Sequence, residues 1–197
     1  MKVALGAKAH SGWAALVVIG RSNDDFVVVD RRRIELVQDE WGKQPYHAAE
    51  HLKPDAAQEV VQRGIAAAHR SAVREMRAAV KRERERENEV TACAVLVADP
   101  IPDWSIEGIL AVHFRMHQAE GVLFREALVR AAKACGLRVV AIPEKLLAEH
   151  AERALGTPVS AMAKQLATLG KSVGPPWGKD QKAAALAALV ALKGRSN

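Results

Sequence analysis

The chain has few cysteines and no long hydrophobic run, and both absences exclude whole classes of protein. Its 197 residues include two cysteines, Cys93 and Cys135, which lie in a predicted strand and a predicted helix. They are expected to be small packed residues and not a disulfide framework. No window approaches the roughly 18 apolar residues of a membrane-spanning helix, and an N-terminus interrupted by Lys8 and His10 is not a secretory signal. We therefore expect a single cytoplasmic domain over residues 1–197, with no membrane partner.

Aromatic residues are also scarce, at 4% of the chain, and they do not alternate with basic residues. Tracts that mix the two are typical of proteins that bind single-stranded nucleic acid. The net charge of +6 nevertheless suits an anionic partner, and Arg31, Arg32 and Arg33 form a basic patch that can neutralise phosphates. These arginines and Lys8 are the candidate nucleic-acid contacts. The alternative for the arginines is a solvated strand end.

The pattern of apolar residues predicts an alternation of strands and helices. Three short runs joined by Gly, Ser, Asn and Asp predict an antiparallel meander. A helix with one apolar face follows, and its last turns at 81–87 are charged and expected to be exposed. Expected strands cover 3–6, 14–19, 26–29, 91–98 and 139–142, and expected helices cover 55–88, 105–135 with a bend near Gly121, 144–150, 158–169 and 179–192. Together they predict an α/β fold, a mixed five-stranded sheet with helices on both faces.

The segment Gly6-Ala7-Lys8-Ala9-His10-Ser11-Gly12-Trp13 lies between the first two apolar runs and is expected to be a tight turn. It resembles the first hairpin of the RNase H-like superfamily, in particular its RuvC-type resolvase branch. The resemblance implies the RNase H-like fold over nearly the whole chain. In that family this hairpin carries the first catalytic aspartate, and here the position is occupied by Lys8. No acidic residue precedes Asp24, so no neighbouring carboxylate replaces it.

The resemblance also implies where other metal-binding carboxylates would lie. The family's position at the end of the fourth strand matches Asp99, and its position on the last helix falls near Asp180, with Ala183 where a further acid is expected. Such carboxylates hold Mg²⁺ or Mn²⁺ for phosphodiester hydrolysis. Because the first and fourth strands pair in this fold, we expect an ion pair between Lys8 and Asp99 in place of a metal. The alternative is a lysine that points to solvent.

Two histidine patterns are candidates for metal binding. His47, Glu50 and His51 match the H-x-x-E-H pattern of a zinc protease, although Pro45 and Pro54 leave room for a short helix only. The alternative is a set of surface histidines in a loop.

The second pattern is His113, His117 and Glu120, which recur along one helical face. If this helix packs beside the fourth strand, His117 and Glu120 could approach Asp99, and Asp99, His117, Glu120 and Asp180 would be the metal ligands. The alternative is a polar surface stripe.

We therefore expect a diverged, catalytically inactive relative of RuvC-type nucleases that binds nucleic acid and needs no cofactor. The first alternative is a metal-dependent nuclease using Asp99, Glu120 and Asp180 with Mg²⁺ or Mn²⁺. The second is a protein-interaction module whose surface is the charged helix end at 81–87. The sequence leaves open whether the chain is an enzyme, and it is compatible with a homo-oligomer.

Overall fold

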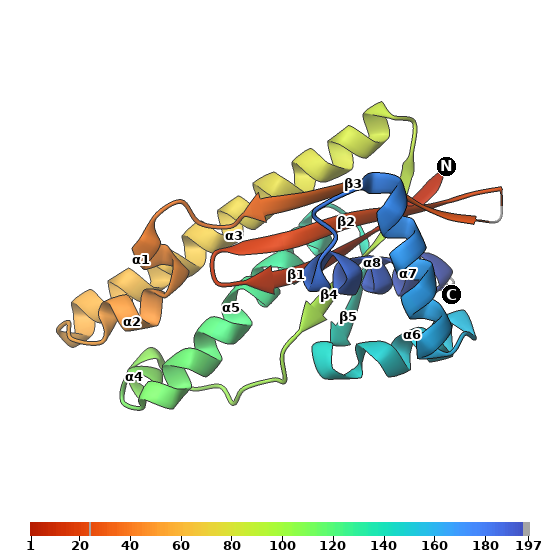
Figure 1. Cartoon of the computed structure of the whole chain (residues 1–197). Coiled ribbons are helices and arrows are strands. Elements are labelled where there is room, and N and C mark those ends of the chain that lie inside the picture. Colours follow the sequence, from red (N-terminus) through yellow and green to blue (C-terminus); the bar gives the residue numbers. More distant parts are fainter. Residues whose placement is uncertain (24, 195–197) are drawn as a thin grey trace.

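A mixed five-stranded sheet forms the centre of the computed structural model, which describes residues 1–23 and 25–194 (Figure 1). Asp24 therefore lies outside the described residues. The strand order is β3-β2-β1-β4-β5. The pairs β1–β2 and β2–β3 are antiparallel, whereas β1–β4 and β4–β5 are parallel. The strands are β1 (Lys2–His10), β2 (Trp13–Ser22), β3 (Asp25–Glu35), β4 (Glu89–Val97) and β5 (Arg138–Pro143).

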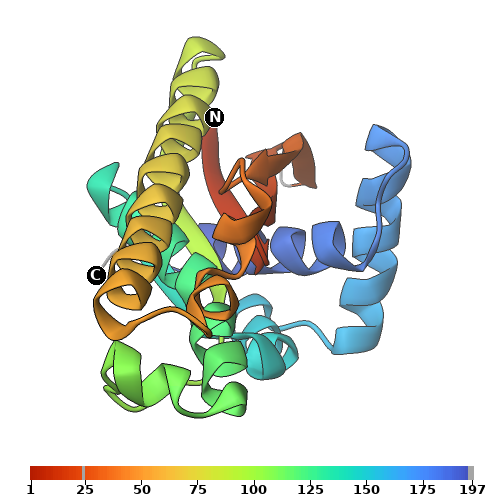
Figure 2. The same cartoon turned by 90° about the vertical axis from the view of Figure 1, so that its left-hand side faces the viewer.

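Helices cover both faces of the sheet, as predicted. Figure 2 shows α3 and α5 on one side of the strands and α7 and α8 on the other. None of the described helices is long and apolar enough to cross a membrane. The helices are α1 (Glu40–Lys43), α2 (Pro45–Ala49), α3 (Pro54–Glu85), α4 (Ile106–Leu110), α5 (His113–Ala134), α6 (Leu147–Leu155), α7 (Val159–Val173) and α8 (Lys179–Lys193), with a short 3₁₀ turn at Glu144–Leu146.

Strand β1 is buried on both faces because each face packs against helices. Val3, Leu5 and Ala7 belong to the core beneath α3 and α5, whereas Ala4 belongs to the core beneath α8. Side chains alternate along a strand, so Lys8 lies on the same face as Ala4 and points toward α8. The free cysteines are also packed, with Cys93 buried in β4 and Cys135 half-buried after α5.

The first hairpin differs from the prediction in the length of its strands. β1 continues to His10 and pairs residue by residue with β2 as far as Trp13, so the turn consists only of Ser11 and Gly12. Gly12 has a φ of +81°, a conformation that glycine adopts without strain. Lys8 therefore lies within a buried strand and not in a turn.

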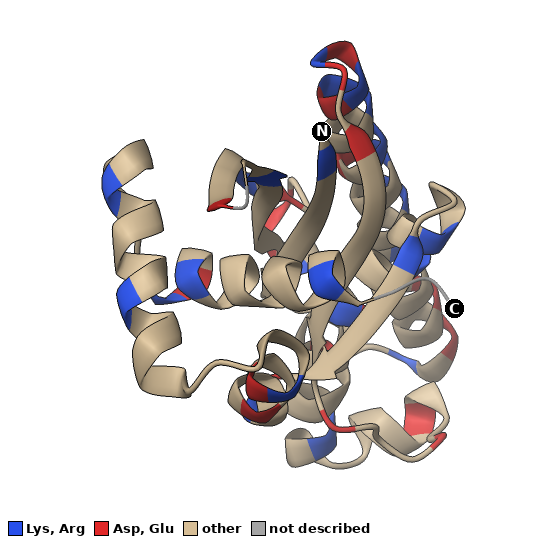
Figure 3. Ribbon diagram, turned by 90° about the vertical axis from the view of Figure 1, so that its right-hand side faces the viewer, with Lys and Arg blue, Asp and Glu red and all other residues tan. Residues whose placement is uncertain are grey.

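Two helical predictions also need correction. The bend expected near Gly121 lies instead at 111–112, between α4 and α5, and Gly121 is inside α5. The charged end of α3 extends beyond the sheet with charges of both signs (Figure 3), but it is not wholly exposed. Glu83 is fully buried and accepts hydrogen bonds from Asn88 and Arg86. This carboxylate anchors the end of the helix to the start of β4.

Helix α8 approaches β1 so closely that only glycine fits between them. A Cβ atom at Gly6 would lie 1.9 Å from the carbonyl oxygen of Ala184 and 2.8 Å from the backbone nitrogen of Ala188. Both obstacles are backbone atoms, which cannot rotate away as a side chain can. The position of α8 on the sheet thus depends on the missing side chain of Gly6.

We expect Gly6→Ala to lower the free energy of unfolding by about 3 kcal/mol or more, because α8 must move to remove the clash. The matched control is Gly121→Ala, where the new methyl group meets only the end of Arg125 at 3.9 Å. That change inside a helix should stabilise the protein by about 0.5–1 kcal/mol. Urea denaturation of the two variants checks this, and equal effects would contradict the close approach of α8.

Candidate functional site

Residues from three elements meet at one edge of the sheet, the edge formed by the C-terminal ends of the parallel strands β1, β4 and β5. Lys8 lies near the end of β1, Glu144 follows β5 directly, and Asp180 lies in the first turn of α8. Lys8 is opposite Ala15 on β2 and Leu96 on β4.

The ammonium group of Lys8 is buried between two carboxylates. Its Nζ lies 2.8 Å from Oε1 of Glu144 and 3.2 Å from Oδ1 of Asp180, and the residue is only 6% exposed. A buried charge needs this kind of partner, because burial without one is strongly unfavourable. The two carboxylates supply the compensating charge.

This ion pair is the middle of a longer row of contacts. Asp180 Oδ2 lies 3.2 Å from Nε2 of His10, and the His10 ring stacks on Trp13 with centroids 4.3 Å apart. The Arg33 guanidinium lies over the Trp13 ring, 4.1 Å from its centre. At the opposite end, Glu144 accepts a hydrogen bond of 3.3 Å from Arg125 on α5. We call these residues the Lys8 row: Arg33, Trp13, His10, Asp180, Lys8, Glu144 and Arg125.

The charges of the Lys8 row hold one another ionised. Burial alone would lower the pKa of Lys8, but hydrogen bonds to Glu144 and Asp180 outweigh it and raise that pKa above its ordinary value. Burial opposes ionisation of Glu144, yet the bonds from Lys8 and Arg125 hold its pKa below the ordinary value. The pKa of Asp180 is lowered in the same way, against burial, by Lys8 and His10. At neutral pH the Lys8 amine is therefore a cation and not a nucleophile.

The structure places Asp99 elsewhere, and the expected Lys8–Asp99 ion pair is wrong. β4 ends at Val97, so Asp99 lies in the following loop. Its side chain is 65% exposed, and its Oδ2 accepts a hydrogen bond of 2.9 Å from Lys145. Glu144, directly after the neighbouring strand, takes the position beside Lys8. A sequence signal for it existed, since Glu144 comes just after the short apolar run at 139–142 that is predicted to be a strand.

Glu120 and His117 also lie outside the Lys8 row. Glu120 is 5% exposed and accepts hydrogen bonds from the backbone N–H and Nδ1 of His47, at 3.2 and 2.8 Å. His117 lies beside His47 and His113. The structure therefore does not bring Asp99, His117, Glu120 and Asp180 together as one set of metal ligands. Among the described residues, the group of histidines, cysteines or acids arranged to hold a metal is His47, His113 and His117.

The three arginines expected to contact nucleic acid have different roles. Arg31 donates hydrogen bonds to the carbonyl oxygens of Val173, Pro175 and Pro176, so it holds the loop after α7. Arg32 pairs with Asp30, and Arg33 pairs with Glu35. The side chains of Arg32 and Arg33 are 41% and 55% exposed and remain accessible to an anionic partner. Lys8, in contrast, is buried.

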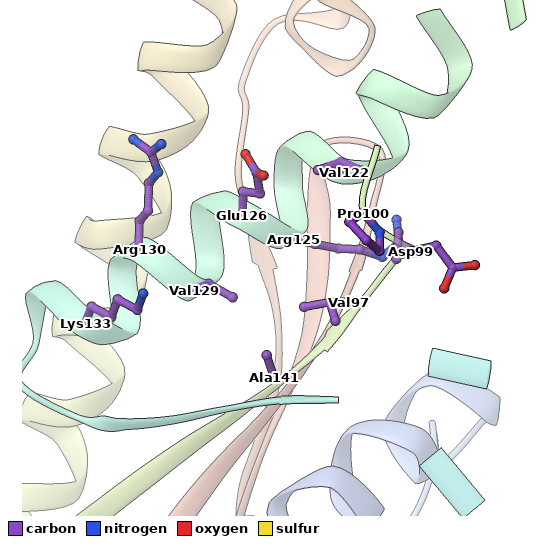
Figure 4. Close-up of a pocket in the computed structure, with 11 residues that line it drawn as sticks. Val97, Asp99, Pro100, Val122, Arg125, Glu126, Val129, Arg130, Lys133 and Ala141 are labelled. Carbon is purple, nitrogen blue, oxygen red and sulfur yellow. The ribbon is translucent and has the colours of Figure 1, made fainter. Parts of the chain in front are cut away.

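A cavity of about 420 Å³ lies beside this edge, between α5 and strands β4 and β5 (Figure 4). Arg130 and Lys133 line it from α5 together with Glu126, and Figure 4 shows the Asp99 carboxylate pointing away from both cations. Basic side chains near its α5 wall suit an anionic group better than a divalent cation.

The acid dependence of stability should reveal the buried ion pairs. Because Glu144 and Asp180 have lowered pKa values, their ionisation stabilises the fold above about pH 4, and this contribution disappears as the pH falls through their folded-state pKa values. The raised pKa of Lys8 keeps its own contribution present until the pH rises above about 10. We expect Lys8→Met to cost about 1–3 kcal/mol at pH 7, because it leaves two carboxylates without their shared cation.

The measurement is urea denaturation from pH 7 to pH 3, where the difference between the native chain and Lys8→Met should shrink as the carboxylates become protonated. The matched control is Lys145→Met, which removes a lysine from the exposed pair with Asp99. Exposed pairs contribute about 0–1 kcal/mol, so this variant should follow the native profile. A Lys8→Met profile parallel to the native one would contradict the assignment.

Comparisons with known proteins give structural relatives only. No protein-family model matches the chain, and no curated protein matches it. A structure of RuvC from Thermus thermophilus is similar, with 14% identity and a TM-score of 0.50 over 95% of this chain and 91% of RuvC. T. thermophilus RuvC in complex with a Holliday junction substrate matches at the same identity and TM-score, over 96% and 92% of the two chains. The likeness extends over nearly the whole chain and confirms the RNase H-like fold that the opening hairpin indicated.

Proposed function

We propose that this chain is a non-hydrolytic nucleic-acid-binding protein in which a lysine replaces the divalent metal of an RNase H-like nuclease. The observation that carries the proposal is the Lys8 ammonium, buried between Glu144 and Asp180 at the ends of the parallel strands. Metal-dependent phosphodiester cleavage needs carboxylates free to bind Mg²⁺ or Mn²⁺. Here both carboxylates already neutralise a cation that belongs to the chain itself.

The hydrolase alternative has less support. Asp180 is paired with Lys8, Asp99 with Lys145, and Glu120 with His47, so the three acids bind three different partners. A divalent cation near Asp180 would also be repelled by the Lys8 ammonium. The protein-interaction alternative also has less support. At the charged end of α3, Glu83 is buried and accepts a hydrogen bond from Asn88, so it does not face a partner.

Three features support binding to nucleic acid. The similar RuvC of T. thermophilus has been solved in complex with a Holliday junction substrate. The net charge of this chain is +6. In addition, the Arg33 guanidinium lies over the Trp13 ring at the end of the Lys8 row and donates to Glu35, contacts that restrain it while leaving the side chain 55% exposed. A restrained arginine loses less freedom when it donates to a phosphate.

A labelled four-way DNA junction provides the first test. We expect binding that weakens with salt, because each neutralised phosphate releases counterions. The double variant Arg32→Gln/Arg33→Gln should reduce the slope of log K against log salt by about 2, roughly 0.9 for each phosphate that the variant no longer neutralises. The matched control, Arg74→Gln/Arg153→Gln, removes the same charge from two exposed pairs on α3 and α6.

An unchanged slope in the Arg32/Arg33 variant would contradict phosphate contacts by these two arginines, and an equal reduction in the control would assign the binding to net charge alone. Absence of binding to the junction at low salt would instead favour a protein-interaction role. Cleavage of the junction by the native chain with Mg²⁺ or Mn²⁺ would overturn the non-hydrolytic assignment.

The replacement of a metal by Lys8 can be tested in reverse. Lys8→Asp puts a third carboxylate beside Glu144 and Asp180, and three acids converging on one point suit a hard divalent cation. We expect this variant to bind Mn²⁺ measurably by calorimetry, whereas the native chain shows no binding at this site. The double variant Lys8→Asp/Asp180→Asn is the control and should lose the added binding. A folded Lys8→Asp protein with no affinity for Mn²⁺ would contradict the idea that Lys8 occupies a metal position.

A further inference from the structure

Three histidines from two separate segments converge on one point. His47 lies on α2, whereas His113 and His117 lie one turn apart at the start of α5, where α2, α4 and α5 gather in Figure 1. Their ring centroids are 4.6 to 5.1 Å apart. The Nε2 atoms of His113 and His117 are 3.2 Å apart, and all three residues offer a ring nitrogen within 4.8 Å of the others.

Two of these rings have a carboxylate beside Nδ1. Glu120 accepts the hydrogen bond from Nδ1 of His47, which leaves the lone pair of the other ring nitrogen available. Oε1 of Glu50 lies 3.6 Å from Nδ1 of His113. Histidines that bind metals almost always have a hydrogen-bonded partner on the second ring nitrogen, which fixes the orientation of the ring and raises its basicity, and Glu120 is such a partner for His47.

We propose that His47, His113 and His117 bind a zinc ion, with Glu120 as the positioning residue for His47. Tetrahedral zinc with Zn–N bonds of 2.0–2.1 Å requires ligand nitrogens about 3.3 Å apart. The Nε2 atoms of His113 and His117 already have this spacing. Both side chains are exposed, so their rings can rotate to bring these nitrogens closer to the ring nitrogen of His47. Imidazole nitrogen favours a transition metal over Mg²⁺ or Ca²⁺. Three protein ligands leave a fourth position for water or an exogenous ligand.

Glu120 points to a metal more strongly than the exposed histidines do. It is 5% exposed, and its oxygens bond both the backbone N–H and the ring of His47, so it fixes one ligand before any ion arrives. Without a metal, the same contacts would simply attach α2 to α5. These two roles of Glu120 differ in one respect, because only the metal-binding role requires His113 and His117.

The proposed zinc site is separate from the Lys8 row. Glu120 and Arg125 are five residues apart on α5, about 7.5 Å along the helix axis, and the two sites share no residue. A test of zinc binding is therefore independent of any test of nucleic-acid binding. It also differs from the ligand set expected from the sequence, because the two histidine patterns each contribute part of the site.

The test is zinc titration of the full chain after treatment with a chelator, followed by calorimetry. We expect one zinc ion per chain, and Co²⁺ in its place should give the intense visible absorption of four-coordinate cobalt. His117→Ala and His113→Ala should abolish both signals. Glu120→Gln should weaken zinc binding by about 10–100-fold, as loss of a supporting carboxylate does elsewhere.

Two matched controls separate this site from its rivals. His51→Ala removes a neighbouring histidine that is 91% exposed, and Asp99→Asn removes an acid of the set expected from the sequence. Both should bind zinc as the native chain does. Failure of the native chain to bind zinc, normal binding by His117→Ala, or an equal loss in His51→Ala would overturn the proposal. Because His117 is exposed, a thermal melt should show that its variant remains folded, and His117→Ala decides the matter even if Glu120→Gln does not fold.

Discussion

The buried ion pairs of Lys8 are the constraint on which the centre of this structure depends. One ammonium group binds Glu144 after β5 and Asp180 at the start of α8, so a single cation joins three elements that are distant in the sequence. Removing Lys8 would leave Glu144 and Asp180, whose side chains are 37% and 27% exposed, without their shared buried cation, which is more costly than losing a fully exposed pair.

Close packing of α8 makes this arrangement possible. Gly6 lies two residues before Lys8 on the same face of β1 and lets the backbone of α8 approach the strand. That approach places Asp180 above the end of the sheet, within 3.2 Å of the lysine. Arg125 and His10 then extend the row to α5 and to the aromatic stack at Trp13. A small residue and a long cation on one strand therefore determine the geometry of the whole edge.

Much of the fold could be predicted from the sequence because its signals are local. Short apolar runs and their turn residues indicated the five strands, and the apolar face of α3 follows from residues three and four apart. Boundaries were less accurate. β1 extends through Lys8 to His10, since pairing with β2 continues past the apolar run. The position of a helix break depends on packing, and Gly121 is accommodated inside α5 while the chain bends at 111–112.

The candidate sites show where local signals end. The sequence by itself determined that the first two strands contain no carboxylate that could replace Lys8. Only the tertiary structure decided that Glu144 and not Asp99 is its partner: β4 and β5 end at the same register, but Glu144 is the first residue after β5, whereas Asp99 is the second residue after β4 and pairs with Lys145. In the same way, His47 meets His113 and His117 across 66 and 70 residues of chain. Spacing along a chain reports which side chains share a helix face, whereas contacts between elements depend on how those elements pack.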